Sequence, residues 1–335
     1  MAMIALNYGE NPQQQGFVAA DASSQDPLAI TRFTLPDGAP ALSDAANMSW
    51  STLKEFDNSL EAITRIAAAF EANLGAVPKI AVLTSRGTPF SAVAGSSDSV
   101  VKRAIENEFR SSYGAFLVTN VEITEQTAYK IRQWMGEDRP FLGIAAPVIE
   151  ASAAPYFTRK VRKCHLLANP ALGNLGRQSL RKEIIAHAIR GATVSQQPNP
   201  YVPTFPADWD QALKEDMSLA WGICAASPSS CITVVKDNNL IANAAGHVQL
   251  VTATENAVLH ARVNQRTEMM RGAAVCSDSF FSFADAIDHL ARRKVKAIFA
   301  PSGSMRDDEV RAHAKEFDVL FHTVPATEGR IFYGH

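Results

Sequence analysis

Short apolar segments alternate with amphipathic segments along most of the chain, and this alternation constrains the fold more than any other feature. In the first half, five apolar residues recur at helical spacing before Gly75, namely Leu60, Ile63, Ala67, Phe70 and Leu74. The segment KIAVL then begins at residue 79, and further helices and strands are expected over 98–109, 115–119, 124–135 and 141–147. This order predicts an α/β domain whose sheet is covered by helices.

A second alternating run follows a proline-rich stretch. The segment SQQPNPYVPTFPADW, residues 195–209, contains four prolines and few helix or strand signals, so we interpret it as an extended connector. Beyond it we expect a helix, a strand, a turn, two helices and a strand over 208–226, 231–235, 237–239, 254–266, 283–293 and 295–301. The predicted division is an α/β domain over 1–196, a connector over 197–207 and a second α/β domain over 208–335.

Two segments of the chain share one pattern, in which an apolar strand is followed by a turn of small and polar residues. KIAVLTSRGTPFSA begins at residue 79 and KAIFAPSGSMRDDE at residue 296, and each is expected to continue from its turn into a helix. Free backbone N–H groups at a helix N-terminus can hold an anion or a polarised carbonyl. The alternative interpretation is that each turn only changes the direction of the chain.

Charge and composition exclude several classes of partner. The formal net charge is -2, too small for electrostatics to indicate a nucleic-acid or membrane partner. The densest basic run, 159–163, is interpreted as a solvated face rather than an anion site. Four cysteines without a C-x-x-C pair indicate reduced thiols, a cytoplasmic location and no metal site. The N-terminus does not have the pattern of a signal peptide, and no segment approaches the roughly 20 apolar residues of a membrane span.

Six motifs between residue 6 and residue 335 carry a resemblance to a known family. LNYGENPQQ, MSWSTLKEFD and SSYGAFLVTN, from residues 6, 48 and 111, resemble L-R-Y-G-x-N-P-H-Q, L-S-Y-N-N-L-x-D and S-A-F-G-G. SDSFFSFAD, APSGSMRDDE and GRIFYGH, from residues 277, 300 and 329, resemble S-D-A-F-F-P-F-x-D, P-G-G-S-x-R-D-x-E and R-x-F-x-H. The family is the transformylase part of the bifunctional purine-biosynthesis protein, which formylates aminoimidazole carboxamide ribotide (AICAR) and cyclises the product.

The resemblance implies a fold, a cofactor and an assembly. It implies two cytidine-deaminase-like α/β domains, a small-molecule substrate, 10-formyltetrahydrofolate as the formyl donor, and a homodimer whose active sites combine both subunits. Because the family's cyclohydrolase domain would precede residue 1, we also expect a stand-alone transformylase.

The central catalytic pair of the family does not match this sequence. In the family a Lys-His pair lies on the turn K-H-x-N-P-x-G. Counting back from Pro89, Ser85 replaces the lysine and Arg86 the histidine, and a shift of one residue gives Thr84 and Ser85. Arginine cannot act as a base at neutral pH because its pKa exceeds about 12, but it can hold a carboxylate or phosphate and stabilise an oxyanion.

Other substrate-side positions differ as well. The resemblance puts Asn7 at the position of a phosphate-holding arginine, next to Tyr8, which is kept, and Ser230 at the position of an asparagine. His247 replaces a glutamine in a loop around the family's active site, where it could supply the missing base. Arg330 is kept at a position that lines the substrate site.

The folate side is better kept. Asp285 matches an aspartate that contacts folate in the family, Phe280, Phe281 and Phe283 match its phenylalanines, and Ser304 matches a serine of its P-G-G-S turn. For Phe281, packing in the core is the competing interpretation.

Three functions stay open at this point. The first is a formyltransferase that uses 10-formyltetrahydrofolate on an acceptor other than AICAR, with Arg86, Ser85 and His247 in the catalytic site. The second is a non-catalytic paralogue that binds a nucleotide or folate, and the third is AICAR formyltransferase activity itself.

Overall fold

The computed structural model describes residues 3–136, 139–158 and 164–334, so the basic run at 159–163 and His335 lie outside the described residues. The strands are β1 (Met3–Ala5), β2 (Phe17–Ala19), β3 (Lys79–Ser85), β4 (Thr88–Gly95), β5 (Phe116–Thr119), β6 (Gly143–Ala146), β7 (His165–Ala168), β8 (Ile185–Ile189), β9 (Ala192–Gln196), β10 (Ile232–Lys236), β11 (Asn239–Ala244), β12 (Ala274–Ser277), β13 (Ala297–Ser302) and β14 (Leu320–Pro325). The α-helices are α1 (Trp50–Leu74), α2 (Ser99–Asn107), α3 (Glu125–Met135), α4 (Ala154–Phe157), α5 (Gln211–Cys224), α6 (Leu250–Val263), α7 (Asp285–Ala291), α8 (Asp307–Glu316) and α9 (Ala326–Gly329).

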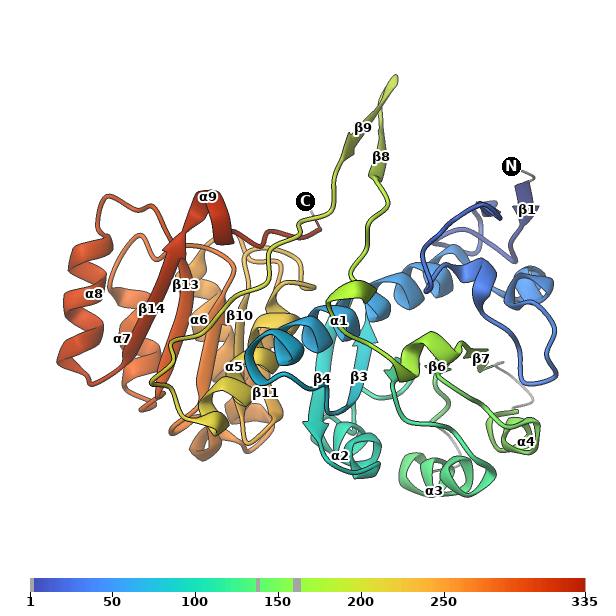
Figure 1. Cartoon of the computed structure of the whole chain (residues 1–335), viewed down its shortest axis with the longest axis horizontal. Helices are drawn as coiled ribbons and strands as arrows, with labels where there is room; N and C mark the ends of the chain where they lie inside the picture. Colours follow the sequence, from blue (N-terminus) through green and yellow to red (C-terminus); the bar gives the residue numbers. More distant parts are fainter. Residues whose placement is uncertain (1–2, 137–138, 159–163, 335) are drawn as a thin grey trace.

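Ten strands form one mixed sheet in the order β14-β13-β12-β10-β11-β4-β3-β5-β6-β7 (Figure 1). Read outward from the middle, β4-β3-β5-β6-β7 and β11-β10-β12-β13-β14 have the same topology, and each half is preceded by a long helix, α1 or α5. The predicted α/β class is therefore confirmed. The chain between β9 and α5 forms no helix or strand, and the predicted domain boundaries stay a prediction.

Helices cover both faces of the sheet. Along β3, Ile80 and Val82 pack with α1 and α5 in one core, whereas Ala81 and Leu83 face a second core formed with α2 and α3. A third core lies on the same side as the second and joins β10 and β11 to α6, α7 and α8. This alternation follows from the two-residue period of strand side chains. The central helices α1 and α5 pack together across the junction of the halves.

Helix α1 positions much of the candidate site. It begins ten residues before the predicted helix, because the Ser49 side chain accepts a hydrogen bond from the Thr52 N–H and the two form a capping box. It ends at Gly75, as predicted, where the backbone is left-handed with φ of 74°. Sixteen of its 25 residues are buried, so the helix runs through the core rather than across the surface.

The prediction that the segment from residue 79 continues into a helix is wrong. β3 is followed by a two-residue turn, Arg86-Gly87, and then by β4, with which it pairs antiparallel. Arg86 and Gly87 have φ of 53° and 76°, the positive values that such a hairpin turn requires. The second segment does run from strand to helix, as β13 and α8. By position in the sheet, the counterpart of β3 is β10, which forms a hairpin with β11 through Asp237-Asn238.

A separate hairpin of β8 and β9 projects from the body of the molecule (Figure 1). Every residue from Ala186 to Gln196 is exposed. None of the four cysteines, which are all buried, forms a disulfide. Among the described residues, no helix is both long and apolar enough to cross a membrane.

Candidate functional site

The hairpin turn of the first half meets the second half at one end of the sheet. Since β4 and β11 are antiparallel, the start of β4 lies beside the end of β11. The Asn243 side chain joins the two strands by donating from Nδ2 to the Pro89 carbonyl over 2.7 Å. Just beyond β11, His247 and Ser230 exchange two backbone hydrogen bonds of 3.0 and 3.2 Å. We call the group Ser85–Thr88, Ser230 and His247 the hairpin end; four of the predicted site residues lie at this end of the sheet, two on the β3–β4 turn and two beside the end of β11.

A buried carboxylate lies under the turn of the hairpin end. Glu55 of α1 is 9% exposed, and its Oε1 accepts a 2.6 Å hydrogen bond from the Gly87 N–H. Burial raises the pKa of Glu55, although the hydrogen bond from Gly87 and the nearby Thr84 hydroxyl and Arg86 N–H act in the opposite direction. Its Oε2 is buried with no hydrogen-bond partner among the described residues. Glu55 thus keeps one oxygen without a partner in the described part of the chain, beneath the turn that carries Ser85 and Arg86.

The C-terminal segment links α1 to the loop before β10. The Tyr333 hydroxyl donates to Asn58 Oδ1 over 3.1 Å, and its carbonyl accepts from the Ser229 N–H over 3.1 Å. Burial raises the pKa of Tyr333, and the carboxylates of Glu61 and Asp57 raise it further, so this phenol stays protonated at neutral pH. Tyr333 therefore serves as a hydrogen-bonding strut between the two halves.

His247 has the electrostatic environment of a base. The side chain is partly buried, and burial together with the charge of His260 lowers its pKa. A neutral imidazole is the form that can accept a proton. Arg86, by contrast, is exposed at the tip of the turn.

The segment that carries the predicted folate-side phenylalanines begins beside Ser230, and three of the predicted residues, Phe280, Phe283 and Ser304, lie near Gly303 and Arg306. Ser230 Oγ is 3.5 Å from Ser279 Oγ, and Phe280 approaches Gly303. The Arg306 guanidinium lies 4.7 Å above the ring of Phe283, which is 55% exposed, and Ser304 Oγ accepts from the Arg306 N–H. Phe281 is 2% exposed and belongs to the core. Asp285 is exposed at the start of α7.

The N-terminus of α8 does not offer the anion site that its position after a strand suggests. Both Asp307 oxygens are occupied, accepting from the N–H groups of Gly303 and Ser304 over 2.7 and 3.2 Å. Three acidic residues occupy the first turn of α8. A negative ligand would be repelled there, because the protein supplies its own carboxylates.

The remaining predicted residues, Asn7, Tyr8 and Arg330, belong to the N-terminal and C-terminal segments. Asn7 and Tyr8 run alongside the residues before α1, where the Asn7 N–H donates to Met48 and Tyr8 bridges to Ser49. The Arg330 guanidinium lies 5.0 Å over the ring of Phe332, and its carbonyl accepts from Asn199.

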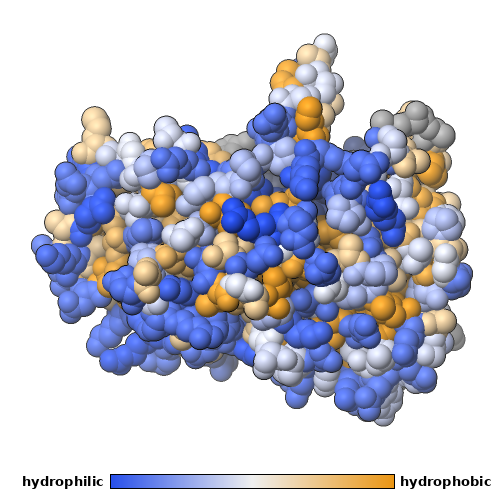
Figure 2. Space-filling model, in the orientation of Figure 1, coloured by the Kyte–Doolittle hydropathy of each residue, from blue (hydrophilic) through white to orange (hydrophobic). Residues whose placement is uncertain are grey.

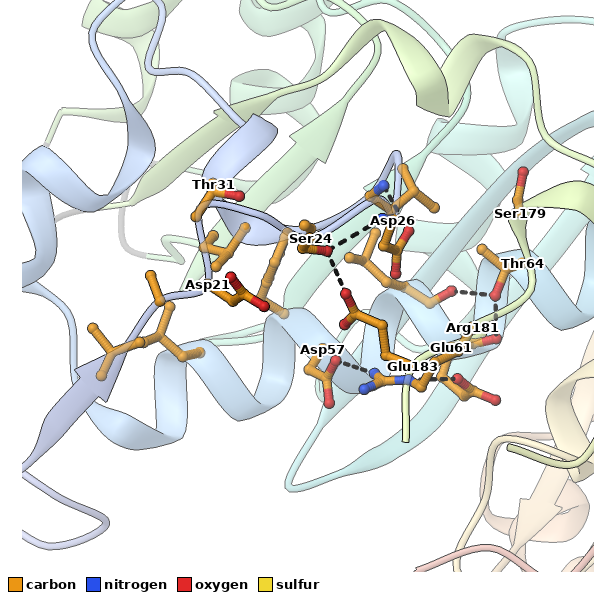
Figure 3. A pocket seen from close by; sticks show the side chains of 18 of the residues that line it. Asp21, Ser24, Asp26, Thr31, Asp57, Glu61, Thr64, Ser179, Arg181 and Glu183 are labelled. Atoms are coloured by element: carbon orange, nitrogen blue, oxygen red, sulfur yellow. Dashed lines mark hydrogen bonds and ion pairs between the residues drawn. The ribbon is translucent and has the colours of Figure 1, made fainter. Parts of the chain in front are cut away.

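A cleft of about 310 Å³ flanks the other side of α1 (Figure 3). Arg181 lies between two carboxylates of α1: it forms an ion pair with Asp57, and its Nε is 3.7 Å from Glu61 Oε2. Glu183 accepts a hydrogen bond from the Ser24 hydroxyl. Burial lowers the pKa of Arg181, but the two carboxylates outweigh it and keep the guanidinium charged. The lining of the cleft includes five acidic side chains and one arginine. No group of three potential ligands that could hold a metal ion occurs in the part of the chain that the structure describes.

Sequence reasoning missed Glu55, Asn58 and Tyr333. A signal for Glu55 exists, since it shares a helical stripe with Ser59, Ala62 and Ile66, all of them buried. A carboxylate on such a stripe is uncommon unless it has a partner or a function.

Comparisons with known proteins agree on one family. Residues 2–260 match the family described as AICARFT/IMPCHase bienzyme. The chain is 26% identical over 323 residues to the bifunctional purine biosynthesis protein PurH of Rhodopirellula baltica, which covers 94% of this chain and 56% of the relative. The PurH proteins of Mycobacterium leprae and Thermotoga maritima are 28% and 25% identical, covering 95% and 96% of this chain and 55% and 62% of the relatives. The chain thus spans little more than half the length of these relatives.

Proposed function

Because the chain belongs to the AICARFT/IMPCHase bienzyme family, we propose that it transfers a formyl group from 10-formyltetrahydrofolate to an amine other than AICAR, in the cytoplasm. A contrast within the site carries the proposal. Phe280, Phe283 and Ser304 form a continuous group beside Ser230, suited to a folate ring. The hairpin turn instead carries Ser85 and Arg86 where the family's Lys-His pair is expected.

Formyl transfer needs a base for the amine proton, donors for the tetrahedral oxyanion and an acid for the leaving folate nitrogen. In this proposal His247 is the base, since its lowered pKa keeps it neutral. Arg86 holds an acidic group of the acceptor or the oxyanion, because guanidinium N–H groups remain charged donors at all relevant pH values. Asn7, Tyr8 and Arg330 line the acceptor side, and Asp285 contacts the folate.

We further propose a homodimer that completes this site. The β8–β9 hairpin supports it, because one face carries Ile185, Ile189 and Val194 together with Ala192, all at positions that point to the same side. Ile189 and Val194 are 52% and 49% exposed, and apolar surface on the projection is visible in Figure 2. An isolated two-stranded hairpin is at best marginally stable in water, so a second copy of the chain is its expected cover.

Calorimetric titration with 10-formyltetrahydrofolate tests the proposal. The wild-type protein is expected to bind it, and Phe283→Ala is expected to weaken binding about tenfold, equivalent to about 1.4 kcal/mol. Phe317→Ala is the matched control, because Phe317 is similarly exposed, at 44%, but lies at the far end of α8. That variant should bind as the wild type does.

Two outcomes would overturn parts of the proposal. No binding by the wild-type protein at high micromolar donor would favour the non-catalytic paralogue. Formylation of AICAR with a kcat on the order of 1–1000 per second would show that the acceptor is AICAR and that the roles given to Ser85 and Arg86 are wrong.

A further inference from the structure

Two helix carboxylates occupy equivalent positions in the two halves of the sheet. In the first half, Glu55 of α1 accepts from the Gly87 N–H in the β3–β4 turn. In the second, Asp216 of α5 accepts from the N–H groups of Asp237 and Asn238 in the β10–β11 turn, over 3.1 and 2.6 Å. Both carboxylates therefore have the structural role of holding a hairpin turn against a helix.

Glu55 and Asp216 differ in the hydrogen bonding of their second carboxylate oxygen. Both Asp216 oxygens accept a backbone hydrogen bond, as a purely structural carboxylate should. Glu55 uses Oε1 alone, and its buried Oε2 has no partner among the described residues. Leaving a buried polar atom unpaired is destabilising, so holding the turn does not by itself explain a glutamate at this position.

A second pair of equivalent residues shows the same asymmetry. Asn120, after β5, accepts from the Ile80 N–H and donates to the Pro78 carbonyl, so its oxygen and its nitrogen each have a partner. Its counterpart Asp278, after β12, accepts from the Cys231 N–H, while its buried Oδ2 is unpartnered among the described residues. Glu55 and Asp278 thus both lie at the hairpin end of the sheet, and their satisfied counterparts lie at the opposite end.

We propose that Glu55 is the general acid that protonates the leaving folate nitrogen in the formyl transfer, and this inference rests on the proposed function. The acceptor amine attacks the formyl carbon, a new C–N bond forms and the bond from the formyl carbon to N10 breaks. His247 takes the proton that the amine loses, and Glu55 gives its proton to N10, directly or through one water molecule. Both groups then exchange a proton with solvent, so no redox partner is required.

The electrostatic environments of Glu55 and His247 fit their proposed roles as acid and base. Burial raises the pKa of Glu55 and favours its protonated form, as it also does for Asp216 and Asp278, whereas burial lowers the pKa of His247 and favours its neutral form. The charged side chain whose field reaches Glu55 is Lys54 of the same helix, which is 3.4 Å from Asp57 Oδ2, and the exposed Arg86 belongs to the adjacent turn. The acid thus lies beneath the β3–β4 turn, and the base lies in the loop after β11 at the same end of the sheet.

Glu55→Gln tests the inference, and Asp216→Asn is its matched control in the other half. Binding of 10-formyltetrahydrofolate is measured by calorimetry in buffers of different ionisation enthalpy, which gives the protons exchanged. Tetrahydrofolate release is followed from pH 5 to 9 with AICAR and a panel of small amines. At a buffer pH at which Glu55 is partly ionised in the free protein, wild type and Asp216→Asn are expected to take up a proton on binding, because the reactive complex holds Glu55 protonated. Glu55→Gln should bind within threefold of wild type without proton uptake, and release the product about 10²–10⁴-fold more slowly.

Each other result has a distinct meaning. Proton uptake that persists in Glu55→Gln would overturn the role of Glu55 while leaving folate binding intact. An equal loss of binding and of thermal stability in both variants would reduce Glu55 to a holder of the turn. Failure of the wild-type protein to bind the donor would overturn the proposed function and this inference together.

Discussion

Gly87 is the residue of the hairpin turn whose conformation matters most. Its φ of 76° is a left-handed value that costs an L-residue about 1–2 kcal/mol, and an added Cβ would lie 3.3 Å from Asn58 Nδ2. We expect Gly87→Ala to lower the free energy of unfolding by more than that backbone cost, because Asn58 is fixed by its bond from Tyr333. Urea denaturation measures the change.

Gly38 provides the control for Gly87. Its φ is 86°, and an added Cβ there would meet nothing within 4 Å. Gly38→Ala should therefore show the backbone cost alone. If Gly87→Ala destabilises the protein no more than Gly38→Ala, the contact between the turn and Asn58 contributes nothing.

The pH dependence of stability reports on Glu55 independently of any ligand. Because burial raises its pKa in the folded state, the folded protein binds this proton more tightly than the unfolded chain, whose carboxyl has a pKa of about 4.3. The stabilisation that protonated Glu55 contributes is present below its pKa in the unfolded chain, and it is lost as the pH rises through its pKa in the folded protein. The Tm of Glu55→Gln minus that of wild type should therefore increase from pH 4 to pH 7, and a decrease would contradict the buried-acid assignment.

Individual site residues were predictable from the sequence to different degrees. Motif matches assigned Phe280, Phe283 and Ser304 to the folate side. The structure places Phe283 and Ser304 against Arg306, and Phe280 near Gly303, and their role in binding stays a prediction. The roles assigned to Arg86 and His247 stay predictions. Glu55 escaped notice because its importance depends on the unpaired oxygen, which only the folded arrangement of α1 and the turn reveals.

At the scale of elements, alternation located most of the α-helices but fewer than half of the strands, and it did not predict that β3 is followed by β4. A glycine in the second position of a two-residue turn, followed by the apolar segment TPFSAVAG, is a hairpin signal that was outweighed by the expected strand-to-helix order. Proline is uncommon inside strands because it has no backbone N–H to donate, yet Pro89 is the second residue of β4. Its carbonyl accepts from Asn243, so a side chain supplies part of the bonding there.

Asn243 holds β4 and β11 together where their backbones pair at only one registered position, Asn239 with Val93. Its Nδ2 donates to the Pro89 carbonyl and to Ser227 Oγ, and its Oδ1 accepts from Thr233 Oγ1 over 2.7 Å. Asn243→Ala would leave these groups unpaired in a buried position, so we expect a loss of at least about 1–3 kcal/mol of unfolding free energy by chemical denaturation.

Asn239 lies at the other end of β11 and serves as the control. Its side chain donates to the Asp237 carbonyl in an exposed position, where water can replace the bond. Asn239→Ala should change the unfolding free energy by less than about 0.5 kcal/mol. Equal effects of the two substitutions would show that Asn243 does not fasten the junction.

The whole molecule holds a feature that the sequence pattern did not predict, namely one continuous sheet built from both halves. Alternation of segments predicts strands in each half, but not that β4 and β11 pair across the boundary. That junction depends on α1 packing against α5 beneath it, a contact between residues far apart in the chain. Long-range contacts of this kind leave no periodic trace in the sequence.

The projecting β8–β9 hairpin gives the assembly a direct test. Residues 185 and 196 are paired across the base of the hairpin, so a short Gly-Ser loop can replace the hairpin without disturbing the body of the protein. We expect this deletion to convert a dimer into a monomer in sedimentation velocity experiments, with little change in Tm because the removed residues 186–196 are exposed.

Substitutions within the hairpin test whether the dimer depends on the apolar face or only on the presence of the hairpin. Ile189 and Val194 lie on the face that also carries Ile185, whereas Thr193 points to the opposite side. The double substitution Ile189→Asp, Val194→Asp should weaken the dimer as the deletion does, because two carboxylates would have to be desolvated at the interface. Thr193→Asp should leave the sedimentation coefficient unchanged. A wild-type protein that sediments as a monomer at all accessible concentrations, or a double variant that remains dimeric, would show that a second copy does not cover this face.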